Sequence, residues 1–506
     1  MIDSAVGWIR RSTVPGKGII VHSRQRIPYP EVSGYYIPTL IDIGERDLAR
    51  QYASWLCSVQ LPDGSIGAPS GTYGFAFDTG QVVRGFVAIL PQMPEVETSL
   101  RRACDWLIGS ADAKTGRLLV PPPGRDWSLG ERGEVNEGIH LYCLWPIRQA
   151  GELLNERRYV EFADRSASYY LKRVDLTTFE RPNALGHFFA YIQEALAELG
   201  YLDVARRGLA SIAKYQRPDG SVPGYFDVPW ICSTALAQLA KAWYAIGETD
   251  RADRALAFMS ELQNASGGFF GSYGVRANYF PSTEIAWAAK YYVDAQLMRI
   301  ARHFDVTVGQ YSNDIATEDA RVLALIEQAG DLNGRTVLDA GCGKGRFAAL
   351  LKQRYPGADI TAMDISCEML KHVPAGIRTV QNGILSMPFA AGAFDLVMCI
   401  EALEHVVQID AGIQELSRVV APGGQLIVID KNKTRLGALQ MPDWEKWFGR
   451  DELVEAMARC GLQAAGVEIE GDGRACPQGL FLLWSGRRPA GAASAAPEPC
   501  DEACGR

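Results

Sequence analysis

The sequence has no excess of basic residues. Its 51 Lys and Arg are outnumbered by 59 Asp and Glu, so the formal net charge is −8 and the isoelectric point lies near 5.5. Proteins that bind nucleic acid use clustered Lys and Arg to contact phosphates. No basic stripe occurs along the sequence, and we therefore expect no nucleic-acid partner.

Long apolar runs are also missing. No window approaches the roughly 18 apolar residues that a membrane span requires. Residues 1–4 read Met-Ile-Asp-Ser and lack the basic region and apolar core of a secretion signal. We expect a cytoplasmic protein with no transmembrane segment.

The cysteines follow neither a metal-ligand nor a disulfide pattern. There are 11, an odd number, and most are scattered singly through apolar segments, which is typical of reduced core thiols. Those in apolar segments include Cys57, Cys104, Cys143, Cys232 and Cys399. We expect no bound metal ion. Cys500 and Cys504 belong to an Ala- and Pro-rich tail, residues 490–506, which we expect to be disordered.

What the sequence does contain is a buried-strand pattern that ends in glycines. Residues 337–340 read Val-Leu-Asp-Ala, and Gly341, Gly343 and Gly345 follow. Glycine lets the backbone turn sharply and approach a ligand where a Cβ would collide with it. A helix is predicted over 346–354. Because Arg346 stands where the dinucleotide-binding fingerprint has its third glycine, a dehydrogenase is disfavoured.

From about Asp319 onward, helical and strand patterns alternate. Such alternation predicts a parallel sheet with helical crossovers. The predicted strands are 336–339, 360–364, 379–380, 396–399 and 425–430. The second strand ends at Asp364, about 20 residues past the glycines, a spacing at which an acidic residue binds ribose hydroxyls. We expect an α/β Rossmann-like domain over residues 318–489, within a multidomain chain.

In this order, the motifs resemble those of class I S-adenosylmethionine (SAM)-dependent methyltransferases over about residues 310–489. The resemblance implies SAM as the cofactor. By that resemblance, Asp339 and Gly341 meet the methionine end of SAM, Gly343 and Gly345 belong to the same loop, and Asp364 binds the ribose.

The expected adenine pocket departs from the family pattern. Family members often have an acidic residue in a Gly-Asp-x-x-x-Leu-Pro-Phe string, whereas residues 382–389 read Asn-Gly-Ile-Leu-Ser-Met-Pro-Phe. The amide oxygen of Asn382 is expected to replace that acid. Gly383 and Ile384 are expected to line the pocket, with Ile365 and Met387 flanking the adenine.

Acid and base side chains follow the fourth predicted strand, where residues 401–406 read Glu-Ala-Leu-Glu-His-Val. Methyl transfer from a sulfonium is an in-line displacement, so the enzyme mainly aligns the acceptor and removes its proton. We expect His405 to be the base, although a structural role stays open, and Glu401 to serve both catalysis and cofactor binding. Trp444 and Trp447, in an insertion, are expected to shape the acceptor pocket.

The first 300 residues contain an internal repeat. Helical segments recur at intervals of about 40 to 65 residues, and most run into turns such as Gln-Leu-Pro-Asp-Gly-Ser at 60–65 and Gln-Arg-Pro-Asp-Gly-Ser at 216–221. The period fits helix pairs, and six pairs would close into an all-α (α/α)6-type toroid over residues 1–297. An open solenoid is the alternative. Residues 298–317 are expected to be a linker.

This half resembles the six-hairpin toroids of glycoside hydrolases and polysaccharide lyases. Its Gln-x-x-Asp-Gly turns resemble those of prenyltransferase and terpene-cyclase repeats. The strings at 29–35, 77–81 and 287–291 are similar to toroid proteins of surface-polysaccharide biosynthesis. The Asp-x-Asp-Asp acid of the cyclases and the zinc set of the prenyltransferases are absent, so we expect neither chemistry.

Several acids in loop-like segments of the repeat could converge. Glycosidic cleavage needs two carboxyl groups at a defined separation, although capping and turn roles are the open alternative. The candidate acids are Glu31, Asp78, Glu131, Glu134, Glu137 and Asp227. His140 and His187 are candidate acid/base residues, and loop aromatics such as Trp127 and Trp230 could stack on sugar rings. As glycan-binding residues we name Asp78, Glu137, His187, Asp227 and Trp230.

The leading hypothesis is a SAM-dependent O-methyltransferase that acts on a saccharide or surface-glycan intermediate, with the toroid binding the glycan. Two alternatives stay open. One is a small-molecule natural-product methyltransferase with a toroid scaffold, because fold does not fix the acceptor. The other is a bifunctional protein in which the toroid is a glycan hydrolase or lyase.

Overall fold

The computed structural model describes residues 1–69, 71, 73–118, 137–471 and 477–491. The chain divides into two compact units, one formed by residues 1–41 and 45–299 and the other by residues 42–44 and 300–506. We call them unit 1 and unit 2. Trp127, Glu131, Glu134 and most of the tail at 490–506 lie outside the described residues.

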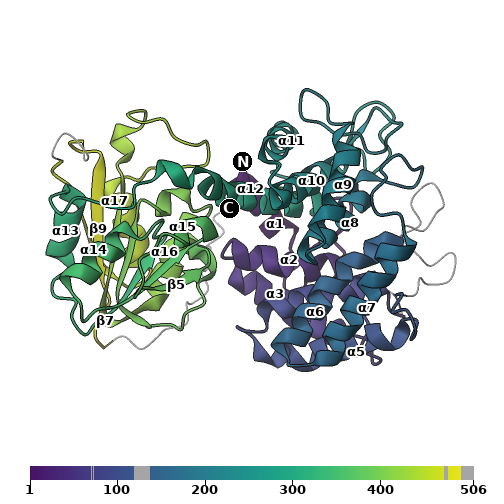
Figure 1. Cartoon of the computed structure of the whole chain (residues 1–506), viewed down its shortest axis with the longest axis horizontal. Helices are drawn as coiled ribbons and strands as arrows, with labels where there is room; N and C mark the ends of the chain where they lie inside the picture. The colour runs from purple at the N-terminus through teal and green to yellow at the C-terminus, as the bar shows by residue number, and fades with distance from the viewer. Residues whose placement is uncertain (70, 72, 119–136, 472–476, 492–506) are drawn as a thin grey trace, which may run out of the picture. The chain divides into compact units, whose positions relative to one another are not determined.

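Unit 1 is built from helices in succession (Figure 1). Two two-residue strands, β1 (Ile231–Cys232) and β2 (Ser272–Tyr273), pair antiparallel. The helices are α1 (Ile2–Ser12), α2 (Pro30–Asp42), α3 (Arg46–Val59), α4 (Ala76–Ile89), η1 (Pro94–Val96), α5 (Glu97–Ser110), η2 (Glu137–Cys143), α6 (Leu144–Leu153), α7 (Arg157–Arg173), α8 (Gly186–Glu198), α9 (Leu202–Ala213), α10 (Ser233–Ile246), α11 (Thr249–Glu261) and α12 (Ala286–Thr307).

Burial alternates along this series. In α2, α4, α8 and α10 nearly every side chain is buried, whereas α1, α3, α5, α7, α9 and α11 bury only one face. A helix that is apolar all round belongs to the interior, and one with a single apolar stripe covers it. The burial pattern therefore distinguishes interior helices from covering helices over most of unit 1.

The inner helices contact one another in chain order. α10 packs against α8, α8 against η2, and η2 and α6 against α4. α2 and α12 are joined because the Tyr36 hydroxyl donates to the Ala286 carbonyl at 2.7 Å and the Thr39 hydroxyl donates to Asp294 at 2.7 Å. Lys241 lies 3.5 Å from Asp294, which connects α10 to α12.

Unit 2 contains a seven-stranded sheet in the described part of the chain, in the order β5-β4-β3-β6-β7-β9-β8. The first five strands in that order are parallel. β9 runs antiparallel to β7, and β8 runs antiparallel to β9. The strands are β3 (Thr336–Ala340), β4 (Asp359–Asp364), β5 (Arg378–Gln381), β6 (Phe394–Ile400), β7 (Val420–Lys431), β8 (Gln463–Glu468) and β9 (Phe481–Arg487). The α/β Rossmann-like prediction for this part of the chain is confirmed.

Helices and short 3-10 turns cover and connect the strands of unit 2. The helix predicted over 346–354 is present with those bounds as α14. The segment 298–317, expected as a linker, contains the last turns of α12 and the turn η3. These elements are η3 (Val308–Gln310), α13 (Ala320–Ala329), α14 (Arg346–Arg354), α15 (Cys367–Leu370), η4 (Ile384–Ser386), η5 (Leu403–His405), α16 (Ile409–Val419), η6 (Lys433–Arg435) and α17 (Arg450–Arg459).

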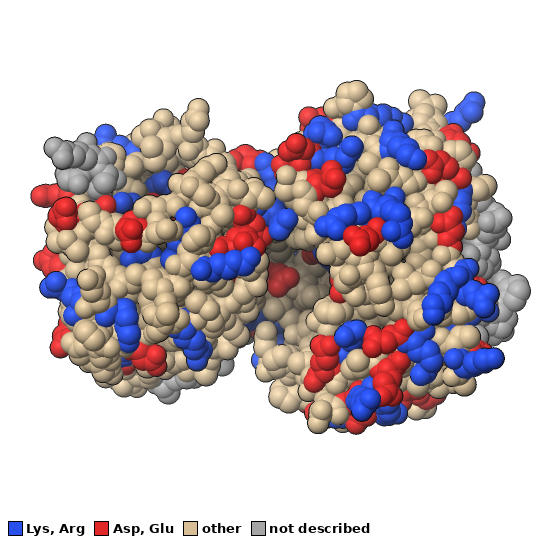
Figure 2. Space-filling view, viewed as in Figure 1, with Lys and Arg blue, Asp and Glu red and all other residues tan. Residues whose placement is uncertain are grey.

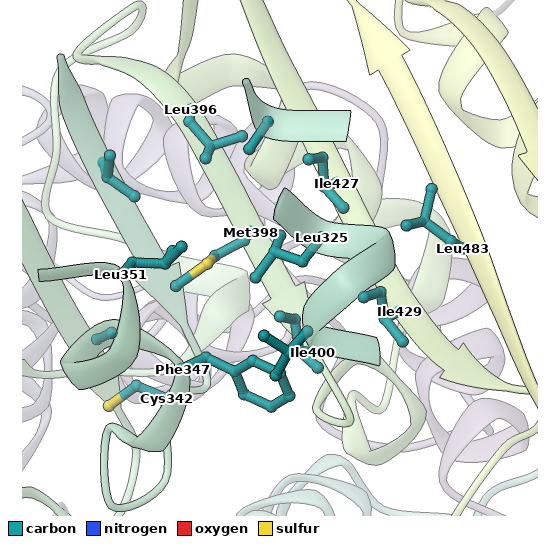
Figure 3. Close-up of a cluster of buried hydrophobic side chains, with 14 of the residues drawn as sticks. Leu325, Cys342, Phe347, Leu351, Leu396, Met398, Ile400, Ile427, Ile429 and Leu483 are labelled. Carbon is teal, nitrogen blue, oxygen red and sulfur yellow. The ribbon is translucent and has the colours of Figure 1, made fainter. Parts of the chain in front are cut away.

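The central strands of the sheet are buried on both faces. Successive side chains of a strand point to opposite sides, so each of these strands contributes to two apolar clusters. On β6, Leu396, Met398 and Ile400 belong to one apolar cluster, and Val397 and Cys399 belong to the other. Figure 3 shows the first cluster, in which side chains of β6 and β7 meet those of α13 and α14. The two cores fix the carboxyl ends of the parallel strands at one edge.

On the face drawn in Figure 2, acidic and basic side chains are interspersed over both units rather than separated by sign. None of the helices in the described part of the chain combines the length and the apolar character that crossing a bilayer requires.

A glycine contact between α2 and α4 gives a test of the helix packing in unit 1. A Cβ added at Gly85 would overlap the carbonyl oxygen of Gly34. Because backbone atoms cannot move aside, we expect Gly85→Ala to lower the free energy of unfolding by about 1–3 kcal/mol. Gly109→Ala, in α5 where a Cβ meets nothing within 4 Å, should raise it by about 0.5–1 kcal/mol. Chemical denaturation measures both, and equal effects would contradict the packing.

Candidate active site

The glycine loop after β3 needs glycine for two different reasons. Gly341, Gly343 and Gly345 all have positive φ, of 77°, 53° and 76°, which side-chain-bearing residues rarely adopt. A Cβ at Gly341 would overlap that of Ala402, whereas a Cβ at Gly343 meets nothing within 4 Å. Gly341 is therefore required by packing, and Gly343 borders open space at the edge of the sheet.

Asp364, the last residue of β4, closes this loop. Its carboxylate accepts the backbone N–H of Gly343 at 2.7 Å and that of Ser366 at 2.9 Å. The side chain is buried, and burial raises its pKa despite these two hydrogen bonds. One carboxylate thus holds the turn after β3 and the turn after β4 together.

Asp339, on β3, is a buried acid of this edge whose pKa is strongly raised. It is 2% exposed, and its Oδ2 has no hydrogen-bond partner among the described residues. Burial, followed by the charge of Asp364, raises the pKa of Asp339 to about 7. A buried acceptor left unsatisfied costs free energy unless a ligand completes it.

These groups fit the cofactor that the resemblance implies. The Oδ2 of Asp339, which no described residue satisfies, suits the ammonium of the methionine part. The open space at Gly343 admits a ligand close to the backbone. Asp364 presents a carboxylate to ribose hydroxyls. Asp339, Gly343 and Asp364 are therefore the residues that would hold SAM.

The residues expected around adenine lie at the turn after β5. The oxygen of Asn382 accepts the N–H of Gly383 at 2.7 Å and the Ser386 hydroxyl at 3.0 Å. Both bonds occupy the oxygen that the sequence assigned to the adenine amino group. Ile384 and Met387 are buried and belong to one apolar cluster. A Cβ at Gly383 would have only Ile365 nearby, at 4.0 Å.

Glu401 follows β6 in a strained conformation, with φ at 52°. Arg321 donates to its carboxylate at 2.6 Å and Arg346 at 2.8 Å. Non-glycine residues with positive φ concentrate at functional sites. Two guanidinium groups already engage the Glu401 carboxylate, so it is less available to an acceptor than His405 is. Neither arginine was predicted.

His405 contacts Glu404, which forms a carboxyl pair with Asp430. Its Nε2 lies 3.4 Å from Glu404 Oε1, and its Nδ1 is buried without a hydrogen-bond partner among the described residues. Burial opposes ionisation of Glu404, but hydrogen bonds with His405 and Asp430 and the charge of Lys431 lower its pKa to about 2. Burial and the Glu404 charge raise the pKa of Asp430 well above its usual range, so Asp430 carries the proton of that pair.

The segment expected as a linker supplies side chains to this edge. The Phe304 ring lies 4.9 Å from the His405 ring and 6.1 Å from the Tyr311 ring. Lys344 Nζ donates to the Tyr311 carbonyl at 2.7 Å, and the Ser366 hydroxyl donates to Asp305 at 2.7 Å. No repeat or motif in the sequence distinguishes this segment from a spacer.

The two tryptophans of the expected acceptor pocket differ. The ring of Trp444 is 5.2 Å from that of His303, which leads on to Phe304. Trp447 is 4% exposed, packs in an apolar cluster and donates to Glu445 at 2.6 Å. Trp447 is therefore a core residue. Trp444 belongs instead to a row of rings, with His303 and Phe304, that leads to His405.

Glu404, His405 and Glu445 place metal-ligand atoms within 4.8 Å of one another. Lys431 contacts both glutamates, at 3.3 Å in the case of Glu445. An ammonium therefore already neutralises the two carboxylates, and a metal ion would have to displace it.

In unit 1, the predicted glycan-binding residues are dispersed over several elements. Asp78 and His187 lie buried in the first turns of α4 and α8. Glu137, at the start of η2, is paired with Arg117. Asp227 is exposed in the loop before β1, and the buried ring of Trp230 meets Tyr225 edge-on at 5.8 Å. His140, predicted as an acid/base candidate, is buried in η2.

Residues 338–428 match the family model of a methyltransferase domain. A ubiquinone biosynthesis O-methyltransferase of Bordetella avium is 28% identical over 28% of this chain and 67% of its own length. A fatty-acid O-methyltransferase of Mycolicibacterium smegmatis is 29% identical over 23% of this chain and 43% of its own. An uncharacterised protein of Methanocaldococcus jannaschii is 40% identical over 20% of this chain and 42% of its own.

A solved SAM-dependent methyltransferase from Mesorhizobium loti has 18% identity, covering 34% of this chain and 99% of that chain at a TM-score of 0.30. The family match and the named relatives identify a SAM-dependent methyltransferase domain in unit 2, with SAM as its cofactor. The chain spans less than half the length of two of the three relatives.

The raised pKa of Asp339 predicts that SAM binding depends on pH. An ammonium binds the ionised carboxylate, and a carboxyl with a pKa of about 7 is mostly protonated at pH 6 and mostly ionised at pH 8. We expect the Kd for SAM to fall about tenfold between these values, measured by titration calorimetry.

The control for this measurement is Asp339→Asn. This variant should bind SAM weakly at both pH values and, because it removes a buried charge, should melt no lower than the unaltered protein at pH 8. A Kd that stays constant across the range in the unaltered protein would contradict the assignment of Asp339.

Proposed function

We propose that unit 2 transfers the methyl group of SAM to a hydroxyl oxygen of its acceptor, with His405 as the general base. The observation that carries the proposal is the buried Nδ1 of His405, for which the described residues provide no hydrogen-bond partner. The imidazole lies beside an ionised Glu404 and on the same sheet edge as Asp339 and Asp364. SAM, when bound, supplies a methyl group on a sulfonium.

The carboxylate fixes the tautomer of the histidine. Because the pKa of Glu404 is lowered to about 2, its carboxylate accepts the Nε2–H of His405, which leaves the lone pair on Nδ1. A hydroxyl placed against Nδ1 gives up its proton there, and the imidazolium that forms faces the Glu404 carboxylate. Asp430 and Lys431 hold Glu404 in place from below.

A group of aromatic rings supports an acceptor with a flat or ring-shaped face next to the hydroxyl. These rings belong to His303, Phe304, Tyr311 and Trp444. The finer proposal, a saccharide or surface-glycan intermediate, rests on these rings and on the resemblance of unit 1. The relatives favour the second candidate, a non-sugar small molecule, since the named ones belong to ubiquinone biosynthesis and fatty-acid methylation.

For unit 1, we propose that the helix pairs close into an (α/α)6-type toroid over residues 1–297. The alternation of inner and outer helices and the hydrogen bonds that join α12 to α2 support closure over an open solenoid. A toroid brings the same ends of its inner helices to one mouth.

We expect His405→Gln to lower kcat by about 10²- to 10⁴-fold, the usual contribution of a general base. The Kd for SAM should stay within about twofold, because His405 contacts the acceptor side. Methyl transfer is measured with labelled SAM, alongside His372→Gln, which alters an exposed histidine. Equal activity in both variants would leave His405 a structural role and contradict the base assignment.

The acceptor class is tested by incubating the protein with methyl-labelled SAM and host extract, then separating polysaccharide, lipid-linked saccharide, protein and small-molecule fractions. Gly343→Arg fills the open space at the glycine loop and serves as the blank. Label in a saccharide fraction, absent from the blank, is the expected result. Label confined to small molecules would replace the saccharide with the second candidate, and no label in any fraction would contradict methyl transfer itself.

A further inference from the structure

Unit 1 gathers polar and aromatic side chains from the starts of its inner helices. Glu31, Asp78, His187 and Trp287 lie in the first turns of α2, α4, α8 and α12. The Trp287 indole donates to Glu31, and its ring centroid is 6.3 Å from that of His187. These helices therefore present their first turns to one another.

Glu31 and Asp78 form a buried carboxyl pair. They are 4% and 0% exposed, and the Tyr29 hydroxyl donates to Asp78 at 3.2 Å. Burial, followed by the Asp78 charge, raises the pKa of Glu31 well above its usual range. Two like charges on neighbouring buried carboxyls cannot both form at low cost, so the pair favours the state in which Glu31 holds a proton.

His187 contributes a neutral acceptor. Burial lowers its pKa to about 3. Gln238 donates its amide to Glu194 at 2.8 Å, so the Gln238 oxygen accepts from His187 Nδ1 at 3.0 Å. The lone pair of His187 consequently lies on Nε2, and the rings of Tyr191, Tyr279 and Trp287 surround the imidazole at 4.4 to 6.3 Å.

Tyr35 is the observation that points to a ligand. It lies one helical turn after Glu31 on α2. Burial, followed by the charge of Glu31, raises the pKa of Tyr35. Its side chain is 0% exposed, and its hydroxyl has no hydrogen-bond partner among the described residues. Folding alone favours Phe at such a position, because a buried hydroxyl without a partner is costly.

The nearby cations already face carboxylates. Lys290 donates to Asp294 at 2.8 Å, Lys241 to Glu194, and Arg84 to Glu198 at 2.7 Å. An anionic ligand would meet the Glu31 and Asp78 carboxyls. An ammonium ligand can only donate hydrogen bonds, and the Tyr35 hydroxyl and the protonated Glu31 also need acceptors.

We propose that unit 1 binds a neutral saccharide at the site formed by Glu31, Tyr35, Asp78 and His187. Sugar hydroxyls donate and accept at once, which matches one protonated acid, one carboxylate, one phenol and one neutral imidazole. The rings of Tyr191, Tyr279 and Trp287 offer faces for the apolar surface of a sugar. The proposal does not rest on methyl transfer in unit 2.

The test uses the full chain on an array of neutral oligosaccharides built from hexoses and N-acetylhexosamines, with uronic-acid oligosaccharides and alkylamines alongside. Calorimetry then gives the Kd of the tightest neutral ligand. Tyr35→Phe should raise this Kd roughly threefold to tenfold, which corresponds to the loss of one hydrogen bond. It should not lower the melting temperature. Tyr201→Phe, at a half-buried tyrosine before α9, should change neither.

Asp78→Asn is the second variant, and Asp203→Asn, on the surface of α9 with a side chain 90% exposed, is its matched control. The first should weaken saccharide binding at least tenfold, and the second should not. Cleavage of the bound oligosaccharide would also support the site, as binding followed by turnover. Preference for amines or uronates, no neutral ligand at millimolar concentration, or unaltered binding in Tyr35→Phe and Asp78→Asn would overturn the proposal.

Discussion

The hydrogen bond from the Gly343 backbone to the Asp364 carboxylate is the contact on which the unit 2 site depends. It joins the turn after β3 to the turn after β4, and the same carboxylate also accepts from Ser366. A residue with a side chain at 341 would push this loop off Ala402. The N–H groups of Gly341 and Cys342 donate to the Met363 carbonyl of β4. Asp339, which precedes the loop, is buried, and its Oδ2 has no hydrogen-bond partner within the described ranges.

Strand order then determines which other groups reach this edge. β3 lies between β4 and β6, so Asp339 lies between the acid that ends β4 and the residues that follow β6. The Glu401–His405 turn belongs to β6, and Asp430 and Lys431 end β7, directly beside it. The histidine and its supporting carboxyl pair are therefore neighbours for the same reason that parallel strands end together.

Sequence patterns predicted those elements whose structure depends on neighbouring residues in the chain. The β3 strand, the glycine turn and α14 follow from a short apolar run and from backbone angles that only glycine adopts easily. The arginines on Glu401 come from positions 80 and 55 residues away in sequence, and no local pattern specifies such a contact. Trp447, which was predicted at a pocket, is 4% exposed and packs in an apolar cluster. Local sequence does not separate an aromatic residue that lines a pocket from one that belongs to the core. Strands β8 and β9 were missed. β8 comes only after the insertion and α17, and β9 pairs antiparallel with β7 and β8, which differs from the parallel pattern that revealed the other strands.

Both units carry buried polar atoms that have no hydrogen-bond partner in the described part of the chain. In unit 2 these include Asp339 Oδ2 and His405 Nδ1, and in unit 1 the Tyr35 hydroxyl. Three largely buried cations of unit 1, in contrast to these polar atoms, have partners. Each of Lys241, Lys290 and Arg84 pairs with a carboxylate, as a buried charge requires. A sequence optimised for stability alone would place Asn at 339 and Phe at 35. Retaining an ionisable acid and a phenol in the interior costs stability, which a bound ligand can return. The two sites are thus located by the same physical signature, although one is built on strand ends and the other on helix starts.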